Sequence, residues 1–210
     1  MRASLRIVCA VLSWALMVGS GSRGGIETSA ATLLGPACEP PDSMQLDIPL
    51  TPQETGAWCW AAAAQMVLAS PSLSVFVSQC DVATKRFGPG SGCCNAAGIP
   101  DTCVRGAWPP FGEYGYTPTV TKDAPLSWDE IKMQIGCRKQ AFAFTWHMDN
   151  GGDHMMVATG YKTDAANHLV CVNNPLPLGT GQAYCLPYDE YVSGPNYSHG
   201  NDYYNLVKNK

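Results

Sequence analysis

Ten cysteines in a chain of 210 residues constrain the fold more than any other feature of this sequence. A chain of this length can bury a sufficient core without crosslinks, so small size does not explain them. The N-terminal segment offers an explanation, because Arg2 and Arg6 precede an apolar run (7–18) that is followed by small residues. This pattern predicts a signal peptide over residues 1–22, or up to residue 31 if cleavage is later. Export would place the chain in a secreted or periplasmic, oxidising compartment, where disulfides persist.

Composition and charge exclude several classes of protein. Apolar residues make up 46% of the chain, which excludes a disordered or low-complexity protein. Residues 1–22 hold two of the 13 basic residues and no acidic one, so their removal leaves 17 acidic against 11 basic residues, a net charge of −6. This balance disfavours nucleic acid as a partner. The apolar run is shorter than the roughly 20 residues that span a bilayer. We therefore expect no stable membrane span after signal removal, and we expect a monomer.

The texture of the chain changes from helical in its first half to strand-like in its second. Residues 32–52 are rich in proline and are expected to form an extended lead-in, and residues 88–125 are expected to form irregular loops pinned by cysteines. Apolar spacing and capping signals predict three helices, at 59–69, about 74–86 and 128–136. Alternating or apolar runs predict strands at 141–147, 154–161, 168–173, 182–186 and about 202–207. Helices followed by strands indicate an α+β protein with a helical lobe up to about residue 125 and an antiparallel β-rich lobe after it.

The segment around Cys59 is the strongest indication of chemistry. Cys59 falls in the first turn of an apolar helix, where the partial positive charge of the helix N-terminus favours a thiolate, the nucleophile of acyl transfer. Gln53 lies six residues earlier, and its amide could donate a hydrogen bond to a developing oxyanion. Trp58 and Trp60 are expected to wall the site. The alternative is a structural cysteine or one half of a disulfide.

The number of cysteines favours the nucleophile. Cys9 lies in the apolar run and is lost with the signal peptide, so nine cysteines remain. An odd number of cysteines in an exported protein implies one free thiol or an intermolecular bridge. Parity does not say which cysteine is unpaired. Only Cys59 lies at a predicted helix start, where a free thiol could act as a nucleophile. If Cys59 is the free thiol, the other eight cysteines can form four disulfides. A zinc site is disfavoured because the sequence has no C-x-x-C pair.

A cysteine nucleophile needs a base, and the sequence has four histidines. His154 is the preferred candidate, because it opens an apolar strand directly after a glycine-rich turn and can reach a cleft from a rigid element. His147, at the end of the preceding strand, is the second candidate. His168 and His199 are expected to be ordinary surface residues.

The imidazole also needs a partner that orients it. Asn173 and Asn174 end the strand that follows the one opened by His154, so adjacent strands would bring one of them close to it. A shift of one residue in strand register exchanges the two. We expect Asn174 to be the orienting residue, with Asn173 as the alternative.

The set Gln53, Cys59, His154 and Asn174, in this chain order, resembles the papain-like cysteine peptidases, and especially their small bacterial secreted branch, which includes plant-pathogen effector proteases. The likeness extends over residues 53–191 and includes the Trp-Cys-Trp-Ala-Ala block, the stretch 79–83 and the adjacent cysteines 93 and 94. It implies a papain-like two-lobe domain over residues 53–210, with the active site in the cleft between the lobes. It also implies hydrolysis of protein or peptide substrates without a cofactor or metal.

Two features qualify this resemblance. The base would lie 95 residues after the nucleophile, whereas plant papain-type enzymes have a spacing of about 130 or more, so the first lobe must be smaller. The same Cys–His core also serves thiol acyltransferases and cell-wall peptide hydrolases. A disulfide-rich secreted binding protein with a decayed site is the alternative that is not an enzyme.

Eight cysteines allow 105 pairings, and the sequence does not choose among them. We expect Cys171 to pair with Cys185 across the β-rich lobe, and Cys80 to pair with either Cys93 or Cys94. A bridge between the adjacent Cys93 and Cys94 is not expected, because it would strain the backbone.

Overall fold

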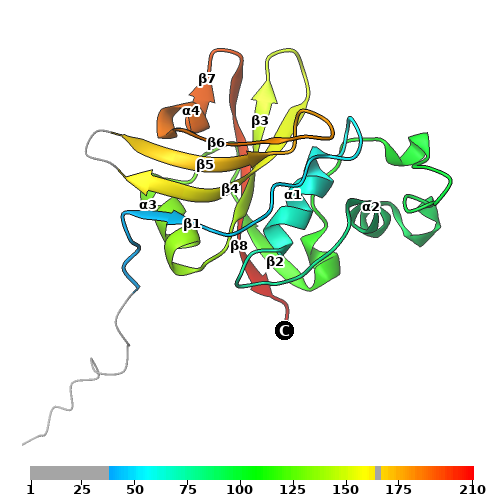
Figure 1. Ribbon diagram of the computed structural model, residues 1–210, viewed down its shortest axis with the longest axis horizontal. Helices are drawn as coiled ribbons and strands as arrows, with labels where there is room; N and C mark the ends of the chain where they lie inside the picture. The colour runs from blue at the N-terminus through cyan, green and yellow to red at the C-terminus, as the bar shows by residue number, and fades with distance from the viewer. Residues whose placement is uncertain (1–37, 164–166) are drawn as a thin grey trace, which may run out of the picture. The chain divides into compact units, whose positions relative to one another are not determined.

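The computed structural model describes residues 38–163 and 167–210, so the predicted signal peptide lies outside the described residues. Residues 38–210 form one unit built from short helices and an antiparallel sheet (Figure 1). Within this described part, no helix combines the length and the apolar character needed to cross a membrane. The predicted α+β class, stabilised by disulfides, is confirmed.

The sheet is antiparallel throughout, and its main strands lie in the spatial order β2-β8-β3-β4-β5-β6. All five predicted strands are present within a few residues of their expected bounds, apart from the last, which begins earlier. The strands are β1 (Ser43–Gln45), β2 (Tyr116–Val120), β3 (Phe142–Met148), β4 (Asp153–Thr163), β5 (His168–Asn174), β6 (Gln182–Pro187), β7 (Ser193–Gly194) and β8 (Tyr197–Lys208). Consecutive residues of β3 and β4 are buried, so both faces of the sheet are covered at its centre.

Four α-helices accompany the sheet: α1 (Cys59–Leu68), α2 (Gln79–Phe87), α3 (Trp128–Lys132) and α4 (Tyr188–Val192). Helix α1 is apolar nearly all round because it packs against β4 on one side and α2 on the other (Figure 1). This double burial explains the four consecutive alanines 61–64, which let both neighbours approach closely. The helix that carries Cys59 is therefore a rigid, buried element.

Two predicted helix bounds are wrong. The second helix begins at Gln79 and not near Ser74, because Ser78 and Asp81 form a capping box and Ser74 has a positive φ of 52°. The third helix starts as predicted, with Ser127 and Glu130 as its capping box, but its α-helical part ends at Lys132. A π-helical turn at Met133–Cys137 continues it.

Two segments contribute more structure than the sequence indicated. The described part of the lead-in contains the strand β1, and β1 pairs with the second half of β4. The irregular segment 88–125 does contain short 3-10 turns, but it also supplies β2, which pairs with β8. The sheet therefore includes residues from before position 125, which the sequence had assigned to the helical lobe.

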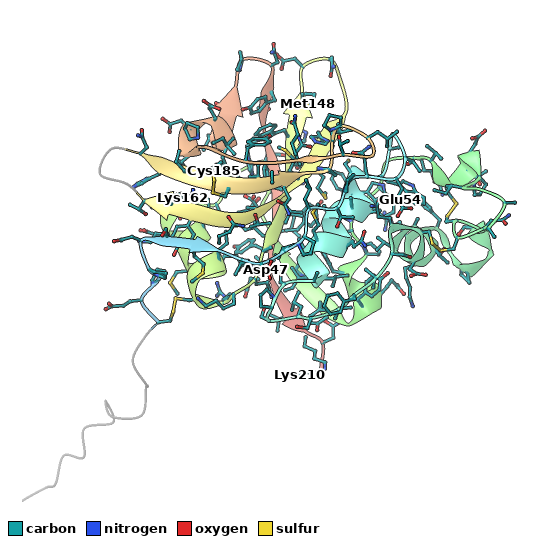
Figure 2. The ribbon with its side chains drawn as sticks, viewed as in Figure 1. Asp47, Glu54, Met148, Lys162, Cys185 and Lys210 are labelled. Carbon is teal, nitrogen blue, oxygen red and sulfur yellow. A yellow bond between two sulfur atoms is a disulfide. The ribbon has the colours of Figure 1, made fainter. Side chains whose placement is uncertain are left out.

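Four disulfides crosslink the described cysteines, and Figure 2 draws their sulfur atoms in yellow. The expected bridge between Cys171 and Cys185 joins β5 to β6, which confirms that prediction. The expected partner of Cys80 is Cys94, whereas Cys93 pairs with Cys103. The sequence did not predict the fourth bridge, which links Cys38 to Cys137.

Candidate active site

Cys59 is the free cysteine of the described part of the chain, and it is half-buried at the first position of α1. Helix α1 has no side-chain cap, so its first backbone amides remain available to a group at this end. The backbone amides of Cys59, Trp60 and Met155 lie close enough to the thiol to lower its pKa. The sulfur therefore lies between the start of α1 and the beginning of β4.

Two tryptophans fix the loop that covers the thiol. The indole of Trp58 is fully buried and donates to the Cys103 carbonyl at 2.7 Å, and the indole of Trp60 donates to the Arg105 carbonyl at 3.1 Å. The disulfide between Cys93 and Cys103 anchors the same loop. Of the two expected walls of the site, Trp60 lines the pocket, whereas Trp58 is buried in the interior and holds the loop from below.

His154 and Asn174 are brought together by neighbouring strands. His154 is the second residue of β4, Asn174 is the last residue of β5, and the two strands pair in antiparallel register. The distance from His154 Nε2 to Asn174 Oδ1 is 2.8 Å. An amide oxygen only accepts hydrogen bonds, so Nε2 carries the proton and Nδ1 is left as a basic lone pair. Cys59 lines one pocket together with Asp153 and Met155, the two neighbours of His154, so the imidazole and the thiol lie near the same end of β4.

Asn173, the alternative orienting residue, points elsewhere. Its buried side chain donates to the Ile48 carbonyl at 3.2 Å and contacts the Met66 sulfur at 3.6 Å. Adjacent residues of a strand face opposite sides of the sheet, which separates the two asparagines. The geometry therefore favours Asn174 over Asn173.

Gln53 is buried, and its segment is tied to both halves of the site. Its backbone amide donates to the Pro175 carbonyl at 3.0 Å, next to Asn174. One hydrogen of its side-chain amide goes to the Thr55 carbonyl at 2.7 Å, which leaves a second hydrogen for another acceptor. Its Oε1 atom has no hydrogen-bond partner among the described residues.

Gln79 holds this segment in place, a role that the sequence did not reveal. Gln79 is fully buried at the start of α2; its Nε2 donates to the Pro52 carbonyl at 2.8 Å, and its Oε1 accepts from the Glu54 amide at 3.0 Å. These two bonds clamp the backbone on either side of Gln53. In the sequence, the stretch 79–83 contributes only to the family resemblance. The one signal available for Gln79 is a glutamine within a predicted helix.

The pKa of the thiol differs from the sequence-based expectation. Burial raises the pKa of Cys59, the three backbone amides lower it, and the nearby charge of Asp153 raises it further. The helix start thus acts in the predicted direction, but burial outweighs it and the net pKa is raised. Burial also lowers the pKa of His154, whereas the hydrogen bond that His154 donates to Asn174 raises it. Both shifts favour a neutral thiol and a neutral imidazole, the state in which the imidazole can act as a base.

A pocket of about 220 Å³ opens beside the thiol. Its apolar walls come from Trp60, Trp108 and Met155, and Asp153 is the charged residue of its lining. The pocket extends the site beyond the reacting atoms and is large enough for a side chain. Nothing in the sequence indicated it, because its lining comes from α1, the loop 106–108 and two strands.

The remaining histidines have other partners. His168 is exposed and stacks on Trp128 with ring centroids 4.3 Å apart, in agreement with the expected surface position. His199 was also expected at the surface, but it is buried: Nδ1 lies 3.0 Å from the Tyr191 carbonyl and Nε2 lies 3.1 Å from Asp202. His147 lies on β3 and pairs with Asp153.

Cys80, Asp81 and Cys94 form the group of potential metal ligands found among the described residues. The two sulfurs are bonded to each other, so only the exposed carboxylate of Asp81 remains to coordinate an ion. This donor set does not fit a metal site.

A free thiol begins a buried helix, and an imidazole hydrogen-bonded to an amide lies near the start of the strand that packs against this helix. The chain belongs to the Peptidase_C39 like family, whose model matches residues 45–197. The predicted class of enzyme is confirmed by this membership, and a protein or peptide substrate follows from it.

No curated protein is similar enough in sequence to match the chain. Among solved structures, it resembles a chain from a study of antibody cross-reactivity between the mite allergens Blo t 1 and Der p 1. The alignment has a TM-score of 0.49 and 13% sequence identity, and it covers 84% of this chain and 74% of that one.

Proposed function

We propose that this chain is an exported papain-like peptidase that cleaves peptide bonds with Cys59 as nucleophile, His154 as base and Asn174 as orienting residue. The observation that carries the proposal is the 2.8 Å contact between His154 Nε2 and Asn174 Oδ1 beside a free thiol. It fixes the imidazole tautomer whose free nitrogen can accept the thiol proton. The neutral state of both groups makes this proton transfer the first requirement of the reaction.

The reaction proceeds in two stages. The Cys59 sulfur forms a bond to the peptide carbonyl carbon as His154 Nδ1 takes the thiol proton. The C–N bond then breaks, and His154 returns the proton to the leaving amine, which leaves a thioester. Water attacks this thioester with His154 again as base, and the thiol and a carboxylic acid are released. Asn174 stays hydrogen-bonded to the imidazolium in both stages.

Two donors are available for the oxyanion that forms in each stage. The Cys59 backbone N–H lies at the unpaired start of α1, and the Gln53 side chain has one amide hydrogen beyond its bond to Thr55. Gln79 fixes the backbone around Gln53, so this donor is held before substrate binds. Removal of one preorganised oxyanion donor typically reduces kcat by about 100- to 1,000-fold.

The compartment in which the protein acts is inferred from its predicted signal peptide and its disulfides. A signal peptide over residues 1–22 and four disulfides both suit a secreted or periplasmic protein. We expect the exported protein to begin after residue 22, or as late as residue 32, and to act as a monomer. Mass spectrometry of the exported, non-reduced protein gives its first residue and its number of free thiols, for which we expect one.

The catalytic test compares matched histidine variants. His154→Gln should reduce peptide hydrolysis by about 100- to 10,000-fold, because it removes the base. His168→Gln, which removes an exposed ring stacked on Trp128, should retain wild-type activity. Cys59→Ala should be inactive, and iodoacetamide should label wild-type protein at Cys59 alone. Full activity of Cys59→Ala, or the discovery of Cys59 in a disulfide by peptide mapping, would overturn the proposal.

A further inference from the structure

Asp153 gives the pocket beside Cys59 a negative side. The other lining residues are uncharged: two indoles, a thioether, a hydroxyl, small residues and the thiol itself. The charge of Asp153 also raises the pKa of Cys59, so it is felt at the thiol. Arg105, next to this lining, has its guanidinium over the Phe87 ring at 4.2 Å and so is already occupied.

His147 is the residue that controls this charge. It lies directly opposite Asp153 in the pairing of β3 with β4, and Thr145 lies opposite Met155, so these four side chains share one face of the sheet. The distance from His147 Nδ1 to Asp153 Oδ1 is 2.5 Å. On its other side, His147 Nε2 lies 3.3 Å from Asp123 Oδ1.

The surroundings of His147 explain how it titrates. Hydrogen bonds to the carboxylates of Asp153 and then Asp123 raise the pKa of His147, while burial lowers it. The facing residues of β8 carry no charge: Ser198 is its register partner, and Gly200 lies beside its ring. Below its raised pKa, His147 is an imidazolium that neutralises Asp153. Above it, the carboxylate faces the pocket without a counter-charge.

We propose that this pocket selects a cationic side chain, lysine or arginine, and that His147 sets the strength of the selection by competing for Asp153. The alkyl stem of such a side chain suits the apolar walls formed by Trp108 and Met155. Its charged end would reach Asp153 and could also lie over the indole of Trp108. The selection strengthens as pH rises, because the competing imidazolium is lost. That the cation belongs to a peptide rests on the proposed function.

The charge of the pocket can be measured without turnover. Two methanethiosulfonate reagents, one with a permanent trimethylammonium-ethyl group and one with a sulfonatoethyl group, both modify the Cys59 thiolate. The ratio of their rates cancels the thiolate fraction and reports the local potential. We expect Asp153→Asn to lower the cation-to-anion ratio about fivefold. We expect the wild-type ratio to rise between about pH 6 and pH 8, and the His147→Gln ratio to be high throughout this range.

The control and the decisive outcomes are separate from those of the peptidase test. Asp149→Asn removes an exposed carboxylate from the same β3–β4 turn and should leave the ratio unchanged. An Asp153→Asn ratio equal to that of the wild type would overturn the inference. In peptides that the enzyme cleaves, norleucine in place of the lysine that enters the pocket should lower kcat/KM for the wild type but not for Asp153→Asn. Charge-selective labelling without any hydrolysis would count against the peptidase proposal and leave the cation site standing.

Discussion

Asn174 is held in place through the oxygen of its side-chain amide. Its oxygen accepts from His154 Nε2 and, at 2.9 Å, from the Leu176 backbone amide. Gln182 is the register partner of Asn174, and Tyr184 is the diagonal neighbour on the same face. The Tyr184 hydroxyl reaches across β5 to the Met156 sulfur at 3.7 Å. Burial raises the pKa of Tyr184, and a hydrogen bond from the Asn174 side chain opposes this rise.

Tyr184 should therefore act as a positioning residue. Tyr184→Phe removes a hydroxyl whose pKa is lowered by the Asn174 side chain, and we expect kcat to fall about fivefold with KM unchanged, the size of one modest hydrogen bond. In an Asn174→Ala background the same change should have no further effect, because there is no amide to orient. Tyr188→Phe, which removes a hydroxyl bonded to the Leu126 carbonyl at 2.9 Å, serves as control. Equal losses in both backgrounds would contradict this role.

At the scale of residues, the free thiol could be predicted from the sequence because its signals are local. Cys59 begins an apolar helix, and the odd number of cysteines left after signal removal predicts one free thiol. The choice between Asn173 and Asn174 depended on strand register, which the sequence does not encode locally. His199 sits among glycine, asparagine and serine, yet it is buried because its partners, Tyr191 and Asp202, are brought to it by the fold.

Capping boxes decided where two helices begin. Ser127 caps α3: its hydroxyl accepts from the Glu130 amide at 3.4 Å and donates to the Glu130 carboxylate at 2.6 Å. Hydrogen bonds from the Ser127 side chain and backbone lower the pKa of Glu130. The carboxylate therefore stabilises the fold above its ordinary pKa of 4.5, and this stability is lost as pH falls through the lowered value.

Removing this cap should have a pH-dependent cost. We expect Ser127→Ala to reduce the free energy of unfolding by about 1 kcal/mol at pH 7. The cost should shrink as pH falls below 4.5 and through the lowered pKa of Glu130, because protonation weakens its bonds to Ser127. Urea denaturation at pH 7 and pH 3.5 measures both values, with the exposed Ser72→Ala as control. A cost that is the same at both pH values would show that Glu130 does not contribute through its charge.

The elements missed from the sequence are those at the margins of the sheet. β1 has three residues, too few for an alternating pattern to be recognised, and it exists because the second half of β4 has a free side. β2 contains Pro118, which normally argues against a strand. It is tolerated because β2 is an edge strand with only β8 as its neighbour. Long, apolar elements were predicted well because their pattern records their burial.

At the scale of the whole molecule, a disulfide joins the described N-terminal segment to the helical turn that follows α3. Cys38 is bonded to Cys137 at the end of the π-helical turn. The two segments approach closely: a Cβ atom on Gly136 would lie 2.9 Å from Pro40 Cβ and 2.6 Å from the Tyr161 hydroxyl. This contact fixes β1 beside β4. The disulfide between Cys38 and Cys137 also closes a covalent loop of 99 residues, which contains the thiol and most of the residues that line its pocket.

This long loop makes a prediction about relative stability. In the chain-entropy description, a disulfide stabilises by restricting the unfolded chain, and the effect grows with the logarithm of loop length. We expect Cys38→Ser/Cys137→Ser to lose roughly 1.5 kcal/mol more free energy of unfolding than Cys171→Ser/Cys185→Ser, whose loop spans only 14 residues. Both pairs lie outside the catalytic set, so both variants should still react with iodoacetamide at Cys59. Urea midpoints measured on the two double variants give the comparison, and an equal or reversed order would show that contacts made by β1 and β5 in the folded protein outweigh loop entropy.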